Sequence, residues 1–149
     1  MEKIAVIGGG AAGMMASIFA ARRGMEVHVY EKNEKTGKKL YITGKGRCNL
    51  TNACDMEELL ESVKSNKKFL YSAFYGFTNQ DAYDFFEAEG LKLKVERGNR
   101  VFPMSDRSAD VLDTLRRAMR SAGVQVHLNT EVKSVRKQED RFTLQLADK

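Results

Sequence analysis

The chain opens with the segment Ile4-Ala5-Val6-Ile7-Gly8-Gly9-Gly10-Ala11-Ala12-Gly13, in which a short apolar run leads directly into small residues. The apolar run is rich in β-branched residues, as is typical of a strand buried on both faces of a parallel sheet. From Met14 to Arg23 neither glycine nor proline occurs, which predicts a helix, and Gly24 is placed to end it. Val27–Tyr30 is a second short strand-like run. Together these segments predict one β-α-β unit with a parallel crossover.

The glycines of this unit have the spacing G-x-G-x-x-G, at Gly8, Gly10 and Gly13. In a Rossmann unit the first glycine permits a tight turn, the second lets the backbone approach a pyrophosphate, and the third lets the helix pack on the strand. The backbone amides at the start of the helix, where Ala11 and Ala12 lie, would then face the phosphates. A structural glycine turn in an unrelated α/β fold is the alternative. A Walker A loop is excluded, because Gly13 is followed by methionine rather than by Lys-Ser or Lys-Thr.

Glu31 ends the second predicted strand, 18 residues after Gly13. A carboxylate at this place can accept hydrogen bonds from ribose hydroxyls, and it repels a 2′-phosphate, which disfavours NADP at this site. The N-terminal segment therefore predicts an α/β Rossmann fold that binds a dinucleotide.

Composition and charge narrow the class of protein. The chain has 149 residues, of which 42% are hydrophobic and 30% charged, with one proline, so we expect one soluble mixed α/β domain. The net charge of +5 is concentrated between Lys32 and Arg47, where six basic residues face one acid. Such a loop suits an anionic ligand, although a solvated lysine-rich loop has the same composition.

Two cysteines and two histidines are too few for a disulfide framework or a zinc pattern, so we expect no metal and a reducing, cytoplasmic compartment. The apolar stretch Ile4–Ala21 is interrupted by glycines and does not read as a leader or a membrane span. We expect both histidines, which lie in predicted strands, to be packed and hydrogen-bonded rather than catalytic.

We interpret the rest of the chain mainly as structural scaffold. Lys32–Asn52 is predicted to be a long, helix-poor loop that wraps a ligand. The aromatic segment Phe69–Phe77 has helical spacing, which favours core or domain-interface packing over a nucleic-acid stacking surface. The further elements that we expect are helices at Asp55–Lys64, Thr78–Glu89 and Ser108–Ala122, each capped by its first residue, a hairpin at Leu91–Phe102, a strand at Val124–Leu128 that returns to the Rossmann sheet, and a hairpin at Glu131–Leu146.

Three segments carry a resemblance to a known family: Gly37–Leu40, the string Thr43-Gly44-Lys45-Gly46-Arg47-Cys48-Asn49-Leu50-Thr51-Asn52, and Arg100–Val111. They resemble the bacterial NAD(P)/FAD-dependent oxidoreductases of the aminoacetone oxidase (BaiN-like) type. The resemblance implies a Rossmann-like FAD-binding parallel sheet of the two-dinucleotide-binding type, with an antiparallel hairpin and extra helices. It also implies bound FAD, hydride or two-electron transfer on an unidentified small organic substrate, and NAD(P)H as a candidate electron donor.

The same resemblance implies a set of cofactor-binding residues. Lys32 and Lys38 would lie near the adenosine and phosphates, Lys45–Asn49 near the flavin ring, and the backbone of Val132 at the adenine edge. The full set is Gly8, Gly10, Ala11, Ala12, Gly13, Glu31, Lys32, Lys38, Lys39, Gly44, Lys45, Gly46, Arg47, Cys48, Asn49 and Val132.

Two further residues of the matching strings have more than one interpretation. Cys48 is either a redox-active thiol, its pKa lowered by Arg47 and Lys45, or a small buried residue that shapes the loop. Asp106 and Arg107 are either substrate-side groups or an ion pair at a helix start. We identify no catalytic residue.

Family members run to several hundred residues, with an inserted substrate domain and a C-terminal segment that closes over the flavin. We therefore expect residues 1–149 to be the N-terminal part of an FAD-binding domain, truncated relative to the family and inactive in isolation. The alternatives are a non-catalytic module for ADP or a dinucleotide, and an RNA-binding domain, which the lack of a nucleic-acid motif disfavours.

Overall fold

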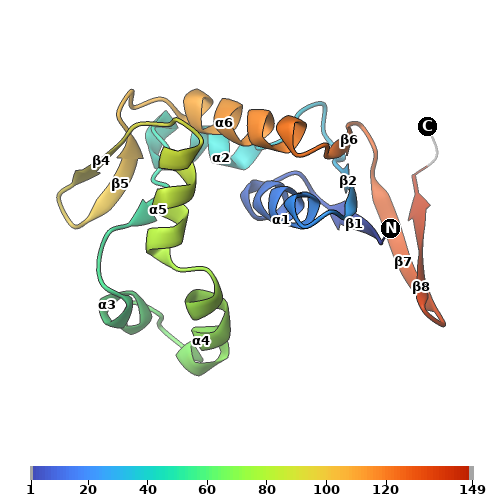
Figure 1. The fold of residues 1–149 in the computed structure, drawn as a ribbon, viewed down its shortest axis with the longest axis horizontal. Helices are drawn as coiled ribbons and strands as arrows, with labels where there is room; N and C mark the ends of the chain where they lie inside the picture. The colour runs from blue at the N-terminus through green and yellow to red at the C-terminus, as the bar shows by residue number, and fades with distance from the viewer. Residues whose placement is uncertain (1, 148–149) are drawn as a thin grey trace. The chain divides into compact units, whose positions relative to one another are not determined.

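The computed structural model describes residues 2–147 and shows two compact units (Figure 1). The first unit comprises Met1–Leu40 and Leu115–Lys149, and the second comprises Tyr41–Thr114. The helix α6 (Ser108–Ser121) contributes residues to both units. In the described part of the chain, every helix is too short or too polar to span a membrane.

The first unit contains the predicted β-α-β motif. Its strands β1 (Lys3–Ile7), β2 (Glu26–Tyr30) and β6 (Gln125–His127) form a parallel sheet in the order β1-β2-β6, and the helix α1 (Ala11–Arg22) connects the first two strands. The buried residues Met14 and Ile18 of α1 and Val27 and Val29 of β2 supply the apolar contact between helix and sheet. The predicted Rossmann-like parallel sheet is confirmed, including the return of the late strand beside β2.

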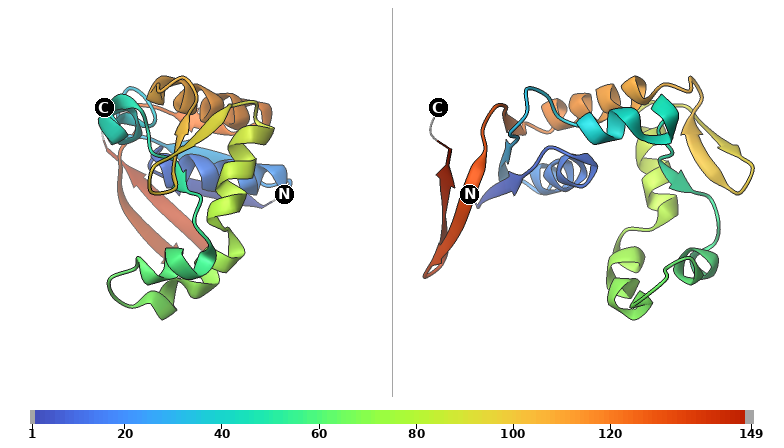
Figure 2. Two further views of the ribbon diagram at one scale, coloured as in Figure 1. Left: turned by 90° about the vertical axis from the view of Figure 1, so that its left-hand side faces the viewer. Right: turned by 180° about the vertical axis from the view of Figure 1, so that it is seen from behind.

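An antiparallel hairpin follows the parallel sheet in the first unit. It consists of β7 (Val132–Gln138) and β8 (Arg141–Leu146), which pair from Gln138–Arg141 at the turn to Val132–Leu146 at the open end (Figure 2). The hairpin expected from the sequence is confirmed.

The second unit combines a small antiparallel sheet with three helices. The sheet has the order β3-β5-β4, formed by β3 (Thr51–Asn52), β4 (Leu93–Glu96) and β5 (Arg100–Pro103), and the helices are α3 (Met56–Glu61), α4 (Lys67–Gly76) and α5 (Asn79–Ala88). The Asp55 carboxylate accepts a hydrogen bond from the Glu58 amide, and Thr78 forms a capping box with Asp81. Both predicted helix starts are therefore confirmed.

Two expectations about local structure are wrong. The segment predicted to be helix-poor contains α2 (Lys38–Ile42) and the 3₁₀ turn η1 (Thr43–Gly46), because left-handed backbone at Gly44 and Lys45 lets the chain turn tightly between short helical pieces. Ser108 does not cap α6: it is the first helical residue, and its hydroxyl donates to the carbonyl of Tyr41 instead.

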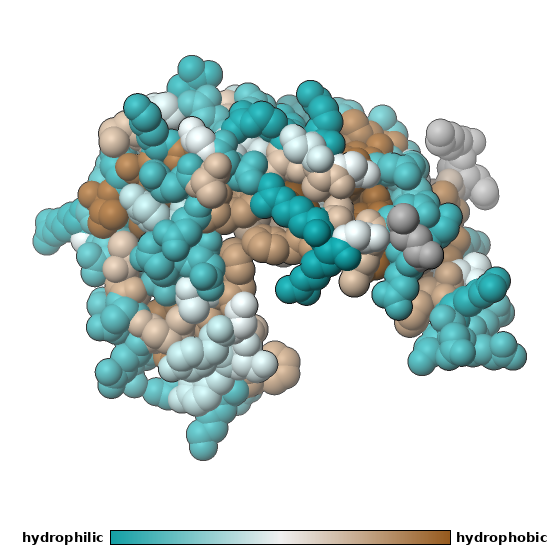
Figure 3. Space-filling model, viewed as in Figure 1, coloured by the Kyte–Doolittle hydropathy of each residue, from teal (hydrophilic) through white to brown (hydrophobic). Residues whose placement is uncertain are grey.

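The aromatic helix α4 does not form core, so of the two expected kinds of packing only a domain interface stays a prediction. Phe69 is 85% exposed and Tyr75 64% exposed, and none of the described residues of α4 is buried. Pale and brown side chains accordingly reach the surface where α4 lies (Figure 3). Helical spacing alone could not distinguish this exposed aromatic face from a buried one.

Candidate dinucleotide-binding site

The glycine loop after β1 is held by contacts that only glycine allows. Gly8 has a φ of +97°, and its amide donates to the carbonyl of Tyr30 at 2.8 Å. A Cβ atom on Gly13 would lie 2.0 Å from the Gly8 carbonyl oxygen, so α1 can start at this distance from the strand only without a side chain there. Gly10 is the N-cap of α1 and has no side chain with which to satisfy the first amides of the helix.

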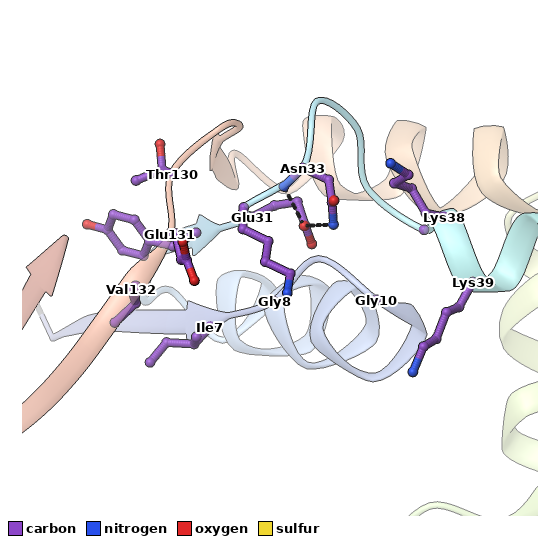
Figure 4. Close-up of a pocket in the computed structure, with 13 residues that line it drawn as sticks. Ile7, Gly8, Gly10, Glu31, Asn33, Lys38, Lys39, Thr130, Glu131 and Val132 are labelled. Carbon is purple, nitrogen blue, oxygen red and sulfur yellow. Dashed lines mark hydrogen bonds between the residues drawn. The ribbon is translucent and has the colours of Figure 1, made fainter. Parts of the chain in front are cut away.

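Glu31 lies at the end of β2 and is 7% exposed. Its Oε2 atom accepts a hydrogen bond from the Gly9 amide at 2.7 Å, while Oε1 accepts from the amide and the side chain of Asn33 at 2.8 and 2.6 Å (Figure 4). Burial by itself raises the pKa of Glu31, but the hydrogen bonds from Asn33 and Gly9 outweigh it and lower the pKa below its ordinary value. The carboxylate is therefore ionised and fixed in orientation.

A pocket of about 400 Å³ lies in the first unit, around the glycine loop and the ends of β1 and β2. Of the sixteen residues predicted from sequence, seven line it: Gly8, Gly10, Glu31, Lys32, Lys38, Lys39 and Val132. The other lining residues are Ile7, Tyr30, Asn33, Gly37, Thr130 and Glu131 (Figure 4). Ala11, Ala12 and Gly13 lie at the start of α1 and are not among the lining residues.

Of the lining residues that sequence analysis missed, most are sequence neighbours of predicted ones. Tyr30 precedes Glu31, and Thr130–Glu131 precede Val132, so extending each predicted position by two residues would have found them. Asn33 carries a clearer signal, because an amide side chain two residues after a buried carboxylate is well placed to orient it.

The basic segment after β2 is anchored as the second wall of this pocket. The amide of Gly37 donates to the carbonyl of Gly9 at 2.8 Å. From α6, the Arg116 guanidinium donates to the carbonyl of Thr36 at 2.8 Å and to its hydroxyl at 3.2 Å. Lys38 pairs with Glu34 at 3.2 Å. The backbone of the segment is thus anchored, while its lysine side chains stay exposed to solvent.

These features fit the ADP portion of a dinucleotide. Amides at the start of α1 and the positive end of its dipole suit a pyrophosphate. The ionised Glu31 suits ribose hydroxyls, and Ile7 and Val132 offer an apolar edge for an adenine ring. Three lysines among the lining residues add positive charge for the phosphates.

The remaining predicted site residues, Gly44–Asn49, belong to the second unit. They form a tight turn in which Gly44, Lys45, Gly46 and Cys48 all have positive φ, between +57° and +82°. Cys48 is 3% exposed, and burial raises the pKa of its thiol. A reactive thiolate would need a lowered pKa, so the expectation of a lowered pKa at Cys48 is wrong. The burial of Cys48 agrees with the other interpretation, a small buried residue that shapes the turn.

Arg47 is engaged with carboxylates. Its guanidinium donates to Asp106 Oδ1 from Nε at 2.8 Å, pairs with Glu96, and lies 4.1 Å over the ring of Phe102. Lys94 donates to the other oxygen of Asp106 at 2.6 Å. Asp106 pairs with Lys94 and Arg47 rather than with Arg107, which pairs with Asp110 at 3.9 Å, so the expected ion pair between Asp106 and Arg107 is wrong in its partners. Hydrogen bonds from Lys94 and Arg47 lower the pKa of Asp106.

The histidines and the possible metal ligands are the remaining groups to describe. Nδ1 of His28 lies 2.9 Å from Nε2 of His127, and the imidazole of His127 stacks on Tyr30, so both histidines are packed and hydrogen-bonded as expected. Within residues 2–147, no group of three His, Cys, Asp or Glu side chains is arranged to hold a metal ion.

The fold defines a Rossmann-like domain, and the pocket at its glycine loop has features that suit a dinucleotide. The family described as "HI0933-like protein Rossmann domain" matches residues 2–149, and the chain belongs to this family. The resemblance inferred from the Gly-Arg-Cys-Asn string is thereby confirmed.

Named relatives in the family have two different activities. The chain is 34% identical over 138 residues to the 3-dehydro-bile acid delta(4,6)-reductase of Clostridium scindens, covering 91% of this chain and 33% of the relative. It is 33% identical over 141 residues to the ribosomal RNA dihydrouridine synthase of Escherichia coli, covering 95% and 34%. The chain thus spans about one third of the length of these relatives.

Solved structures share the fold at low sequence identity. THI4 of Thermovibrio ammonificans superimposes with a TM-score of 0.62 at 12% identity, covering 97% of this chain and 45% of that one. L-proline dehydrogenase from P. horikoshii gives a TM-score of 0.53 at 18% identity, covering 97% and 49%. These likenesses show the Rossmann-like fold.

Proposed function

We propose that this chain binds FAD through its ADP portion and is the N-terminal, FAD-binding part of a flavin-dependent oxidoreductase. The observation that carries the proposal is the pairing of uncapped α1 amides with an ionised, oriented Glu31 in one pocket. The names of the relatives, a reductase and a dihydrouridine synthase, support redox chemistry for the longer protein. The chain covers about one third of the length of these relatives, which supports its being one part of a longer protein.

In this proposal each part of the pocket has one task. The amides from Gly10 to Gly13, at the start of α1, bind the pyrophosphate, since those of Gly8 and Gly9 already donate to Tyr30 and Glu31. Glu31 accepts from the ribose, and Val132 contacts the adenine. Asn33 keeps the Glu31 carboxylate in its acceptor orientation. A bound flavin would supply hydride or two-electron transfer, with NAD(P)H as its proposed electron donor.

The ribose assignment is tested by calorimetric titration of the chain with ADP and with its 2′-phosphorylated analogue. We expect ADP to bind more tightly, because Glu31 repels the added phosphate. Glu31→Gln should weaken ADP about tenfold, the loss of a charge-assisted hydrogen bond, and should narrow the discrimination between the two ligands. Glu57→Gln is the control, since Glu57 is an exposed acid of the second unit and lies outside the pocket lining. Equal binding of both ligands by the unchanged chain would contradict the assignment.

FAD itself is tested by reconstitution. The purified chain is incubated with FAD, desalted, and examined for flavin absorption and for flavin released on denaturation. Retention of FAD would support a pocket that this chain largely completes by itself. Binding of ADP without retention of FAD would place the flavin contacts in other parts of the longer protein, and binding of neither would refute the proposal.

A second candidate substrate is RNA, favoured by the ribosomal RNA dihydrouridine synthases of Escherichia coli and Haemophilus influenzae among the relatives. The exposed Phe69 and Tyr75 of α4 would offer stacking surface for bases. Binding of single-stranded RNA that weakens steeply with salt and falls in Tyr75→Ser would support this candidate. An absence of binding at low salt would remove it for this chain.

A further inference from the structure

A second pocket lies in the first unit, apart from the glycine loop. It has a volume of about 620 Å³ and is formed by the segment Lys35–Thr36, the C-terminal half of α6 and the edge strand β6 with the residues that flank it. Among the described residues, none lines both this pocket and the dinucleotide pocket. We call it the α6 pocket.

The charge of the α6 pocket has one sign. Its lining includes Lys35, Arg116 and Arg120, and none of the described lining residues is acidic. Arg116 and Arg120 are four residues apart on α6 and therefore lie on one face of the helix. Because the Arg116 guanidinium donates twice to Thr36, its charge is held in place at the wall between α6 and the basic segment. An anion would meet cations on two sides.

The rest of the lining is apolar. Met119 is 2% exposed, whereas Val126 and Leu128 are 40% and 39% exposed at the edge of the parallel sheet. Covering these two side chains would remove apolar surface from water, which is favourable. The pocket thus combines a cationic rim with an apolar lining, and its volume lies within the range of roughly 300–1,000 Å³ common for small-molecule sites.

We propose that the α6 pocket binds a small organic anion that joins one anionic head to an apolar body. The head group is held by Arg120, Arg116 and Lys35, and the body covers Val126 and Leu128. A carboxylate, a sulfonate and a phosphate monoester share this chemistry. The assignment is independent of the proposed FAD site.

The test uses anilinonaphthalene sulfonate, whose fluorescence rises in apolar surroundings, titrated into the purified chain. The comparison ligand is the uncharged phenylnaphthylamine, which has the same apolar body without the anion. We expect the sulfonate to bind at least tenfold more tightly than the uncharged compound. Arg120→Gln should weaken the sulfonate about tenfold and leave the uncharged compound unchanged, and Leu128→Ser should weaken both.

Arg117→Gln is the matched control, because Arg117 is an exposed neighbour on α6 that lies outside the pocket lining. Identical titrations for Arg120→Gln and Arg117→Gln would overturn the proposal. Displacement of the sulfonate by ADP would move its site to the glycine loop, and its loss in Phe69→Ser but not in Arg120→Gln would move it to α4. Displacement by single-stranded RNA would mean that the cations of the α6 pocket bind RNA phosphodiesters instead. Each of these three results would also overturn the proposal.

Discussion

The chain contains two glycine-rich turns that are held by different physical means. In the loop of the first unit, Gly13 is required by space, since a Cβ there would lie 2.0 Å from a carbonyl oxygen. In the turn Thr43–Cys48 of the second unit, left-handed backbone occurs at Lys45 and Cys48 as well as at glycines. That turn is closed by the Cys48 amide donating to Thr43 and by the carboxylate partners of Arg47. Steric exclusion therefore decides at Gly13, whereas backbone conformation dominates in the Thr43–Cys48 turn, where residues other than glycine adopt it as well.

The largest effect is expected for Gly13→Ala. The added methyl must push the start of α1 away from β1, so we expect a loss of about 3 kcal/mol in the free energy of unfolding, as for a severe overpacking change. ADP binding should fall below detection because the loop no longer presents its amides. Urea denaturation and ADP calorimetry measure the two effects. A stable variant that binds ADP normally would show that the loop is not sterically determined.

Gly44→Ala and Gly46→Ala test, in the second unit, how much steric contact and backbone conformation each contribute to the need for glycine. A Cβ on Gly44 would lie 3.0 Å from the Asn49 amide nitrogen at a φ of +57°, whereas Gly46 at +82° has open space in the described part of the chain. Left-handed alanine costs about 1–2 kcal/mol, so we expect about 2 kcal/mol at Gly44 and about 1 kcal/mol at Gly46. Urea denaturation of both variants tests this order. The reverse order would mean that φ, which at Gly46 lies further from the ordinary left-handed region, and not the neighbouring atoms, determines the cost.

Gly10→Ala separates folding from binding. Gly10 has a φ of −78°, and a Cβ there would meet no atom of the described residues within 4 Å. We expect stability to change by less than about 0.5 kcal/mol. The methyl would occupy space that the pyrophosphate needs, so ADP affinity should fall about tenfold, or about 1.4 kcal/mol. Unchanged affinity in calorimetry would contradict the placement of the phosphates.

The smallest effect concerns the pH dependence of the Arg47 cluster. Hydrogen bonds with Lys94 and Arg47 lower the pKa of Asp106 below 3.8, and those with Arg47 and Lys94 lower the pKa of Glu96 below 4.5. A carboxyl group whose pKa is lowered on folding contributes stability above its unfolded pKa and loses it as the pH falls through the folded pKa. The excess stability of the unchanged chain over Arg47→Gln should therefore be complete at neutral pH and shrink below about pH 4.

Denaturation of both proteins across this range measures the excess. Because these side chains are partly exposed, salt should reduce it as well. An excess that stays constant down to acid pH would show that Arg47 acts through its packing on Phe102 rather than through its charge.

Sequence analysis predicted the features that depend on neighbouring residues. Strand and helix periods, the caps at Asp55 and Thr78 and the hairpin over 131–146 all follow from local backbone preferences, and the structure has them. It did not predict that α4 would expose its aromatic face. For Cys48 it left open a redox-active thiol and a small buried residue, and the structure has the residue buried, with a raised thiol pKa. Burial depends on what packs against a residue, which a local pattern does not contain.

The sequence by itself determined the Rossmann β-α-β unit, the glycine loop and the acceptor Glu31, because each depends on residues close together in the chain. Only the tertiary structure decided what holds these parts in place. Arg116 anchors Thr36 from 80 residues away, and Arg47 meets Asp106 across 59 residues. The α6 pocket likewise exists only because α6 and β6 lie beside the segment at Lys35. Such contacts between distant residues arise from packing of the whole chain, so they leave no pattern of fixed spacing in the sequence.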